Sequence, residues 1–203
     1  MTELILIRHG ETDINKKQLY CGWNEAGLND RGIKEAERLK DVLAGEKIDV
    51  IYSSDLRRSL HTAEIINSVH SVSIIASYGL RELNFGRWQD ISFEEIRSLY
   101  PEEYKEWTEN WLSYRIPGGE SMIDFYDRVT KTSDEIIEAC KSSKILIVTH
   151  SGPIRCILSK YIGENINTHW HFRVSLGSLT RIEILDGFAI LTEIRQRSYY
   201  DSR

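Results

Sequence analysis

The sequence predicts an α/β fold: a three-layer α/β/α sandwich with a mainly parallel sheet and helices on both of its faces. Short apolar runs alternate with segments of helical periodicity along most of the 203 residues, and this alternation is typical of a parallel sheet. A charged segment rich in Trp and Tyr interrupts the alternation at about residues 80–118. It predicts a helical cap, with helices around 92–98 and 101–112, inserted into a single domain that spans residues 1–203.

The strands are predicted by short apolar runs that are nearly continuous, as expected for strands covered on both faces. The first four runs are residues 4–7, 50–52, 74–75 and 145–148. Two further strands are expected within residues 179–194, joined at Asp186-Gly187. An Asp-Gly dipeptide favours the tight turn of a β-hairpin, so this last pair is expected to be antiparallel.

The helices are predicted where apolar residues recur every three or four positions. Asn29 is expected to cap the first helix and Asp55 the second, because such side chains accept hydrogen bonds from the first free amides. The apolar faces of these two helices would carry Ile33, Ala36, Leu39 and Leu43, and Leu56, Leu60, Ala63 and Ile66. A longer helix is expected over 122–140, and Gly152-Pro153 opens another.

Composition narrows the function classes. The net charge of −5 argues against a general nucleic-acid binder, which would show an excess of basic residues. No signal peptide or membrane-length apolar stretch is apparent, so no membrane partner is expected. Cys21, Cys140 and Cys156 lack metal-type spacing, which favours reduced thiols and a cytoplasmic protein. An anionic substrate would therefore need a local basic pocket.

The first predicted strand runs directly into Arg8-His9-Gly10-Glu11-Thr12. In open α/β sheets, ligands bind at the carboxyl ends of strands. A neutral imidazole there can attack phosphorus while a neighbouring guanidinium binds two phosphate oxygens. The Gly10 carbonyl can orient the other ring nitrogen of His9. Taken alone, an Arg-His pair fits the surface end of a strand equally well.

Three further segments place chemical groups at strand ends. Arg58 follows the second strand in the first turn of a helix, where an anion would relieve its conflict with the helix dipole. Glu82 follows the third strand and could protonate a leaving oxygen. His150 ends the fourth strand, and Ser151 begins a helix whose free amides suit an anion. Each also has a purely structural interpretation, but their common placement favours one site.

Together these segments resemble the histidine phosphatase superfamily, the phosphoglycerate-mutase-like proteins. The matching motifs are Arg8-His9-Gly10-Glu11-Thr12 with Asn15, Ser54-Asp55 with Arg58 and Thr62-Ala63, Arg81-Glu82 with Phe85-Gly86 and Trp88, and Thr149-His150-Ser151-Gly152. The resemblance covers essentially the whole chain. It implies that His9 is the nucleophile and that Glu82 is the general acid, then the base for the attacking water. The implied phosphate pocket consists of Arg8, Asn15, Arg58, His150 and Ser151.

The resemblance implies no metal and no cofactor, since basic side chains supply the positive charge. Other phosphatase chemistries fit less well. No Cys is followed six residues later by Arg, and the chain contains neither Asp-x-Asp nor Gly-x-Ser-x-Gly. His169-Trp170-His171 could suggest a metal site, but no third ligand stands nearby in sequence. We expect these histidines to pack or to line the substrate rim.

The expected substrate is a small phosphorylated molecule. The Glu-Arg-His-Tyr-Gly run of the large mutases is replaced here by Glu82-Leu83-Asn84-Phe85-Gly86, which favours a phosphatase. The chain looks like the α-ribazole phosphatase branch, which acts in the last steps of cobalamin assembly. The segments that carry this likeness are Phe85-Gly86-Arg87-Trp88, Pro117-Gly118-Gly119-Glu120-Ser121 with Asp124-Phe125 and Arg128-Val129, and Gly177-Ser178. A broad-specificity sugar-phosphate phosphatase, a phosphoglycerate mutase and a non-catalytic phosphate-binding scaffold stay open as alternatives.

The aromatic residues of the insertion have two compatible interpretations. They are Trp88, Tyr100, Tyr104, Trp107, Trp111 and Tyr114. Most are expected to form the core of the cap, with one or two reaching a flat leaving group by stacking. Gly22 and Trp23, in the loop after the nucleophile, are expected at the substrate rim. A homodimer is compatible with the sequence, which does not itself specify an oligomeric state.

Overall fold

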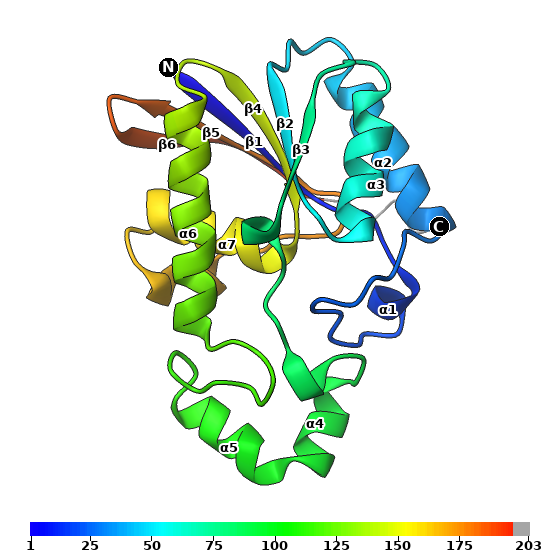
Figure 1. The fold of residues 1–203 in the computed structure, drawn as a ribbon, viewed down its shortest axis with the longest axis vertical. Coiled ribbons are helices and arrows are strands. Elements are labelled where there is room, and N and C mark those ends of the chain that lie inside the picture. Colours follow the sequence, from blue (N-terminus) through cyan, green and yellow to red (C-terminus); the bar gives the residue numbers. More distant parts are fainter. Residues whose placement is uncertain (197–203) are drawn as a thin grey trace.

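The computed structural model describes residues 1–196, which form a six-stranded sheet in the order β3-β2-β4-β1-β5-β6 (Figure 1). The strands are β1 (Thr2–Arg8), β2 (Val50–Ser54), β3 (Ile74–Ser77), β4 (Lys144–Thr149), β5 (Leu179–Leu185) and β6 (Phe188–Arg195). Strands β1 to β4 are parallel, whereas β5 pairs antiparallel with both β1 and β6. The predicted α/β fold with a mainly parallel sheet is thus confirmed, including its antiparallel hairpin.

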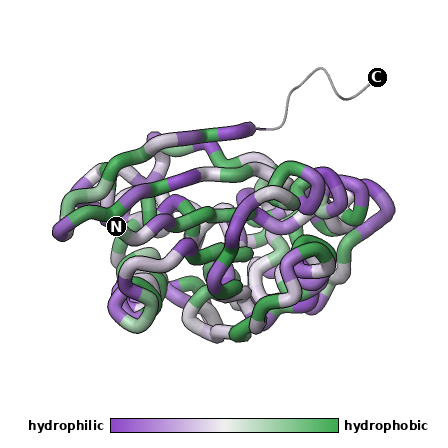
Figure 2. The backbone as a smooth tube through the Cα atoms, turned by 90° about the horizontal axis from the view of Figure 1, so that it is seen from above, coloured by the Kyte–Doolittle hydropathy of each residue, from purple (hydrophilic) through white to green (hydrophobic). Residues whose placement is uncertain are grey.

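Two layers of helices cover the sheet. Helices α2 (Asp30–Leu43) and α3 (Arg57–Asn67) pack on one face, and α6 (Met122–Ala139) and α7 (Ser151–Tyr161) pack on the other. Alternate residues of β1 and β4 point into the two cores: Leu4 and Leu6 face α6 and α7, while Ile5 and Ile7 face α2 and α3. Figure 2 shows hydrophobic and hydrophilic residues interleaved along the helices, as expected when one side of each helix faces the sheet.

Residues 80–118, called the cap segment below, lie beyond the carboxyl ends of the parallel strands (Figure 1). The short elements outside the two helical layers are α1 (Asp13–Lys16), η1 (Tyr78–Leu80), η2 (Gly86–Trp88), α4 (Phe93–Leu99), α5 (Pro101–Glu109) and η3 (Ile166–His171). Trp88, Ile96 and Ile116 form a separate small core, against which Tyr100, Tyr104, Trp107 and Tyr114 pack, whereas Trp111 packs on the main core. Most cap aromatics therefore hold the cap together, as expected.

The local signals for caps and turns had different outcomes. Asn29 caps α2 by accepting the Gly32 N–H at 2.9 Å. The β5–β6 turn falls at Asp186-Gly187, as predicted. The prediction for Asp55 was wrong: α3 has no side-chain cap, because the Asp55 carboxylate forms a bidentate pair with Arg81 at 2.6 and 2.8 Å. The Asp55 carboxylate is thus used by an ion pair between two segments of the chain and does not cap α3.

The expectation that the strands are covered on both faces fails at the edge of the sheet. Strand β3 is at the edge of the sheet that residues 1–196 form, and its Ile75 side chain is 42% exposed. Among residues 1–196, no helix is long and apolar enough to cross a membrane.

Candidate active site

Two parallel strands bring the predicted nucleophile and the second histidine together. Arg8 of β1 is in register with Thr149 of β4, so the next residues, His9 and His150, emerge side by side. Their ring centroids are 5.0 Å apart in an edge-to-face arrangement. Both rings are buried at the carboxyl end of the sheet, where the strand order predicted a ligand site.

Hydrogen bonds fix the tautomer of His9. Its Nδ1 lies 2.7 Å from the Gly10 carbonyl oxygen, which can only accept, so Nδ1 carries the proton. The lone pair of Nε2 then faces the Arg58 Nε–H at 3.2 Å. Burial, followed by the charges of Arg58 and Arg8, holds the pKa of His9 well below its ordinary value. The ring is therefore neutral and nucleophilic at physiological pH.

Arg58 is fully buried at the first turn of α3 and links four groups. Its single Nε–H lies 3.2 Å from both His9 Nε2 and His150 Nδ1. Its two Nη groups donate to the carbonyl oxygens of Asn24 and Gly22, each at 2.6 Å. The guanidinium thus connects the imidazole pair to the loop that follows the nucleophile.

His150 is also neutral in this arrangement. Its Nδ1 accepts from Arg58, so Nε2 carries the proton and donates to Ser54 Oγ at 2.8 Å. Burial, then Arg58 and His9, keep the pKa of His150 well below its ordinary value. An anion bound nearby would oppose these effects and favour the imidazolium.

Arg8 and Asn15 present unused donors to the same space. Arg8 Nη1 donates to the Val174 carbonyl at 2.8 Å, while its buried Nε has no hydrogen-bond partner among the described residues. Burial lowers the pKa of Arg8 to about 10, so it stays charged at neutral pH. Asn15 Oδ1 accepts from the backbone N–H and hydroxyl of Thr12, at 3.2 and 3.0 Å. This leaves the Asn15 Nδ2 amide for a ligand.

Glu82 lies on an irregular segment of the cap, and its carboxylate rests against the start of α7. Oε2 accepts the Gly152 N–H at 3.2 Å, and Oε1 accepts the Leu83 N–H at 3.0 Å. A Cβ on Gly152 would lie 2.1 Å from Oε1, so only glycine permits this approach. The carboxyl group is thereby held at the edge of the histidine pocket.

These groups surround one cavity of about 260 Å³ between the sheet and the cap segment. Seven of the nine predicted site residues line it: Arg8, His9, Asn15, Gly22, Arg58, Glu82 and Ser151. His150 lies behind them, against Arg58. Trp23 does not line the cavity. Its Nε1–H donates to the Glu82 carbonyl at 2.8 Å, and its ring packs against Tyr78 and Arg81.

The cavity wall opposite the phosphate pocket is aromatic. It includes Tyr20, Phe85, Trp107, Trp111, Tyr114 and Trp170. Three of these, Trp107, Trp111 and Tyr114, are among the six insertion aromatics named from the sequence. That one or two of them reach the substrate stays a prediction. Trp170 comes from η3 and lies against Trp111, with ring centroids 6.2 Å apart.

Arg155 is a cavity residue that sequence reasoning missed. Its Nε donates to the Phe172 carbonyl at 3.0 Å, and its guanidinium lies 5.3 Å from the Trp170 ring centroid. Its Nη groups have no hydrogen-bond partner within residues 1–196. Arg155 stands four residues after Ser151 on α7, so a helical projection from that serine would have found it.

Within the described part of the chain, no three His, Cys, Asp or Glu side chains are arranged to hold a metal ion. His169 is buried, with Nδ1 3.7 Å from Cys156 Sγ, and it lines the cavity. Burial lowers its pKa to about 3. Its contacts match the expected packing and rim role.

Known proteins share both the sequence and the fold. Residues 4–196 match the model of the histidine phosphatase superfamily, branch 1. The chain is 33% identical over 195 residues to the adenosylcobalamin/α-ribazole phosphatase of Escherichia coli, covering 96% of each protein. It is 32% identical over 172 residues to phosphoserine phosphatase 1 of Hydrogenobacter thermophilus, covering 85% of this chain and 82% of that one.

Solved structures give the same picture. The α-ribazole phosphatase of Shigella flexneri superimposes with a TM-score of 0.90 at 32% identity, and 96% of each chain is covered. Phosphoserine phosphatase of Entamoeba histolytica, in complex with 3-phosphoglyceric acid, superimposes with a TM-score of 0.85 at 25% identity, covering 97% of this chain and 98% of that one. The chain therefore belongs to the histidine phosphatase superfamily, branch 1, and is a phosphatase of that family.

Proposed function

We propose that this phosphatase hydrolyses phosphate monoesters in two steps, through a phosphohistidine on Nε2 of His9. The observation that carries the proposal is the state of the His9 ring. Nδ1 is protonated and held by the Gly10 carbonyl, so Nε2 keeps its lone pair, which accepts from Arg58 Nε–H at the wall of the cavity. A neutral, oriented imidazole is the form that can attack phosphorus.

In the first step, the Nε2 lone pair forms a bond to phosphorus and the ester P–O bond breaks. Protonated Glu82 gives its proton to the departing oxygen. In the second step, the Glu82 carboxylate takes a proton from water, the water oxygen bonds to phosphorus, and the Nε2–P bond breaks. Arg8 and Arg58 neutralise the charge on the phosphoryl oxygens, and we expect both steps to proceed in EDTA.

The substrate that we propose is α-ribazole 5′-phosphate. Two observations support it: similarity to α-ribazole phosphatases over 96% of the chain, and the aromatic wall of the cavity. Trp107, Trp111 and Trp170 offer faces on which a flat base can stack. The phosphoryl group would then bind at His9 while the base extends toward the cap segment.

Phosphoserine is a second candidate, favoured by Arg155. This guanidinium lines the cavity with unused Nη donors and is partly desolvated, and such a group suits a carboxylate. The relative from Hydrogenobacter thermophilus is itself named a phosphoserine phosphatase. If the leaving alcohol carries a carboxylate, as serine does, Arg155 would be the residue that recognises this carboxylate.

The test is release of inorganic phosphate, in EDTA, from matched esters. The panel holds α-ribazole 5′-phosphate, phosphoserine, 3-phosphoglycerate, fructose 2,6-bisphosphate, a nucleoside monophosphate and p-nitrophenyl phosphate. Strong preference for the first supports the cobalamin assignment, preference for phosphoserine supports the second candidate, and similar rates indicate broad specificity. Arg155→Met separates the two named candidates, because it should raise KM for phosphoserine much more than for α-ribazole 5′-phosphate.

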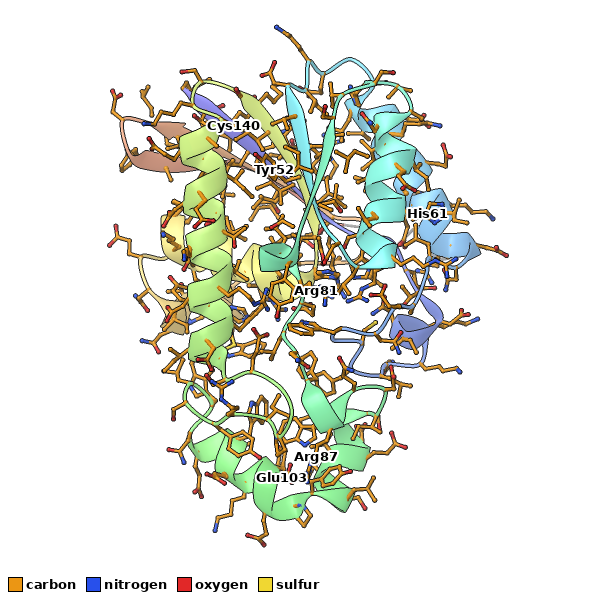
Figure 3. All side chains as sticks on the ribbon, in the orientation of Figure 1. Tyr52, His61, Arg81, Arg87, Glu103 and Cys140 are labelled. Atoms are coloured by element: carbon orange, nitrogen blue, oxygen red, sulfur yellow. The ribbon has the colours of Figure 1, made fainter. Side chains whose placement is uncertain are left out.

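The mechanism is tested by trapping the intermediate. Acid-labile, base-stable phosphate should appear on the protein during turnover and be absent from His9→Asn, whose activity should fall at least about a thousandfold. His61→Asn is the matched control, since His61 lies on the side of α3 away from the cavity (Figure 3). Wild-type turnover by His9→Asn would contradict the mechanism, and no release from any ester would favour the mutase or scaffold alternatives.

A further inference from the structure

The segment that carries Glu82 has no regular secondary structure. Residues 81–85 connect η1 to η2 without belonging to a helix or strand. Backbone carbonyls in such a segment need partners from elsewhere in the protein. The identity of those partners decides how firmly Glu82 is held.

A single side chain of α6, Arg128, binds two carbonyl oxygens of this segment and one just before it, and the Glu82 carbonyl also accepts from Trp23 Nε1–H at 2.8 Å. Arg128 Nη1 donates to the carbonyl oxygens of Gly79 and Arg81, at 3.0 and 3.1 Å. Arg128 Nη2 donates to the carbonyl of Glu82 itself at 3.2 Å. The guanidinium therefore binds the chain on the N-terminal side of the Glu82 side chain.

Glu120 binds the same segment on its other side. Its carboxylate accepts the Asn84 N–H at 2.9 Å, and its own backbone N–H donates to the Asn84 carbonyl at 3.0 Å. Glu120 and Arg128 are joined by two hydrogen bonds of 2.8 Å, Nε to Oε1 and Nη2 to Oε2. Their side chains are only 13% and 14% exposed. A bidentate pair with this little exposure is geometrically rigid.

The remaining residues of the Pro117–Arg128 motif place this pair. A Cβ on Gly119 would lie 2.3 Å from the Asn84 carbonyl oxygen, so glycine lets the two backbones touch. Ser121 and Asp124 form a capping box that begins α6, the helix on which Arg128 stands. Gly119, Ser121 and Asp124 thus support the same short segment or the helix that holds Arg128, although none of them makes a hydrogen bond to the histidines.

We propose that the Glu120–Arg128 pair is a positioning device for Glu82: it fixes the backbone on both sides of this residue so that its carboxyl group meets the leaving oxygen. The proposal rests on the proposed function, in which Glu82 is the general acid. It assigns Arg128 and Glu120 no contact with the substrate. Their effect should therefore appear only in the step where a leaving group needs a proton.

The test compares kcat/KM for two monoesters whose leaving groups differ in need of a proton. kcat/KM reports the steps up to departure of the first product, so the shared hydrolysis of the phosphoenzyme does not obscure the comparison. p-Nitrophenyl phosphate releases a stable phenolate, whereas an alkyl phosphate such as glycerol 3-phosphate must be protonated. Glu82→Gln sets the reference, with a loss on the alkyl ester at least tenfold larger than the loss on the aryl ester.

Arg128→Met should reproduce that leaving-group selectivity, with at least a tenfold larger loss on the alkyl ester. Arg128→Lys should recover part of the loss, because an ammonium can still pair with Glu120. Arg87→Met is the matched control, because it removes an exposed ion pair of the cap with Glu103 (Figure 3). It should leave kcat/KM unchanged for both the alkyl and the aryl ester. Glu120→Gln tests the other half of the pair if Arg128→Met does not fold.

The outcomes separate the two proposals. If Glu82→Gln shows no selectivity, the general-acid assignment in the proposed function fails, and the positioning role fails with it. If Glu82→Gln is selective while the folded Arg128 and Glu120 variants lose both activities equally, or lose neither, the positioning role alone is wrong. Selectivity in Glu82→Gln and in each folded variant of the pair, Arg128→Met or Glu120→Gln, supports the positioning role.

Discussion

Gly152 offers a direct test of how closely the acid must be placed. In Gly152→Ala the new methyl group would lie 2.1 Å from Glu82 Oε1 and 2.7 Å from Phe125 Cζ. Real Cβ atoms keep at least 3.0 Å, so the carboxylate has to move by about 0.9 Å. The same movement weakens its bond to the Gly152 N–H, now 3.2 Å long. The substitution thus displaces a proposed acid without removing it.

The expected effect on catalysis is large and that on stability modest. A misplacement of about 1 Å costs on the order of a hundredfold in rate, equivalent to about 2.7 kcal/mol in the activation barrier. A carboxylate can swing aside cheaply, and only the Phe125 contact adds strain to the core. Overpacking of this kind costs about 1–3 kcal/mol in the free energy of unfolding. Catalysis should therefore suffer more than folding.

The assay is kcat/KM for an alkyl phosphate, alongside urea unfolding of the same preparation. Gly45→Ala is the control, because a Cβ there meets no atom within 4 Å. A double-mutant cycle with Glu82→Gln adds the decisive comparison: once the acid is gone, Gly152→Ala should cost little more. Additive losses in the double mutant would refute the reasoning, as would a Gly152→Ala variant with unchanged kcat/KM.

Three further outcomes follow from the structure. Since burial and neighbouring arginines hold the folded-state pKa of both His9 and His150 below the unfolded value, the unfolded chain binds more protons as pH falls. Stability in urea should decline below about pH 6.5, by up to about 1.4 kcal/mol per pH unit for each ring, and the decline should be shallower in His150→Asn. Leu146→Ala empties a fully buried site on the central strand β4 and should cost about 2–5 kcal/mol in urea unfolding; a loss under 1 kcal/mol would contradict the assigned packing. Asn29→Ala removes the α2 cap and should cost about 1 kcal/mol in urea unfolding, whereas Asn29→Ser keeps an oxygen that can accept the Gly32 N–H and should lose less. Asn29→Asp should not restore stability, because it places a third carboxylate beside Glu11 and Asp13, which the Asn29 amide now contacts.

Local chemistry and strand order allowed most of the site to be predicted. Arg8, His9 and His150 follow apolar strands directly, and parallel strands deliver their carboxyl ends to one edge of the sheet. The Asn29 cap depends only on a side chain and an amide three residues away. When two residues in contact are close in the sequence, the contact can be predicted from the sequence pattern alone.

The residues that could not be predicted depend on contacts between distant segments. Asp55 pairs with Arg81 from another element instead of capping its own helix. Trp23 turns its indole N–H to the Glu82 carbonyl, 59 residues away, and so supports the acid from behind rather than facing the cavity. Arg155 is different: its spacing of four residues from Ser151 on α7 indicates the correct helix face, but its hydrogen bond to the Phe172 carbonyl joins it to a later segment. No spacing along the chain encodes the Asp55 and Trp23 arrangements.

The central place of β1 has a consequence for how the protein folds during synthesis. Within residues 1–196, this strand, which leads into the nucleophile, pairs with β4 and β5 alone, at residues 144–149 and 179–185. At ribosomal rates of about 5–20 residues per second, its apolar residues wait several seconds for a partner. Contacts this distant in sequence slow folding. The nascent chain therefore carries an unpaired hydrophobic strand until residues 144–149 have been made, and a chaperone that shields residues 2–8 should raise the yield of active enzyme.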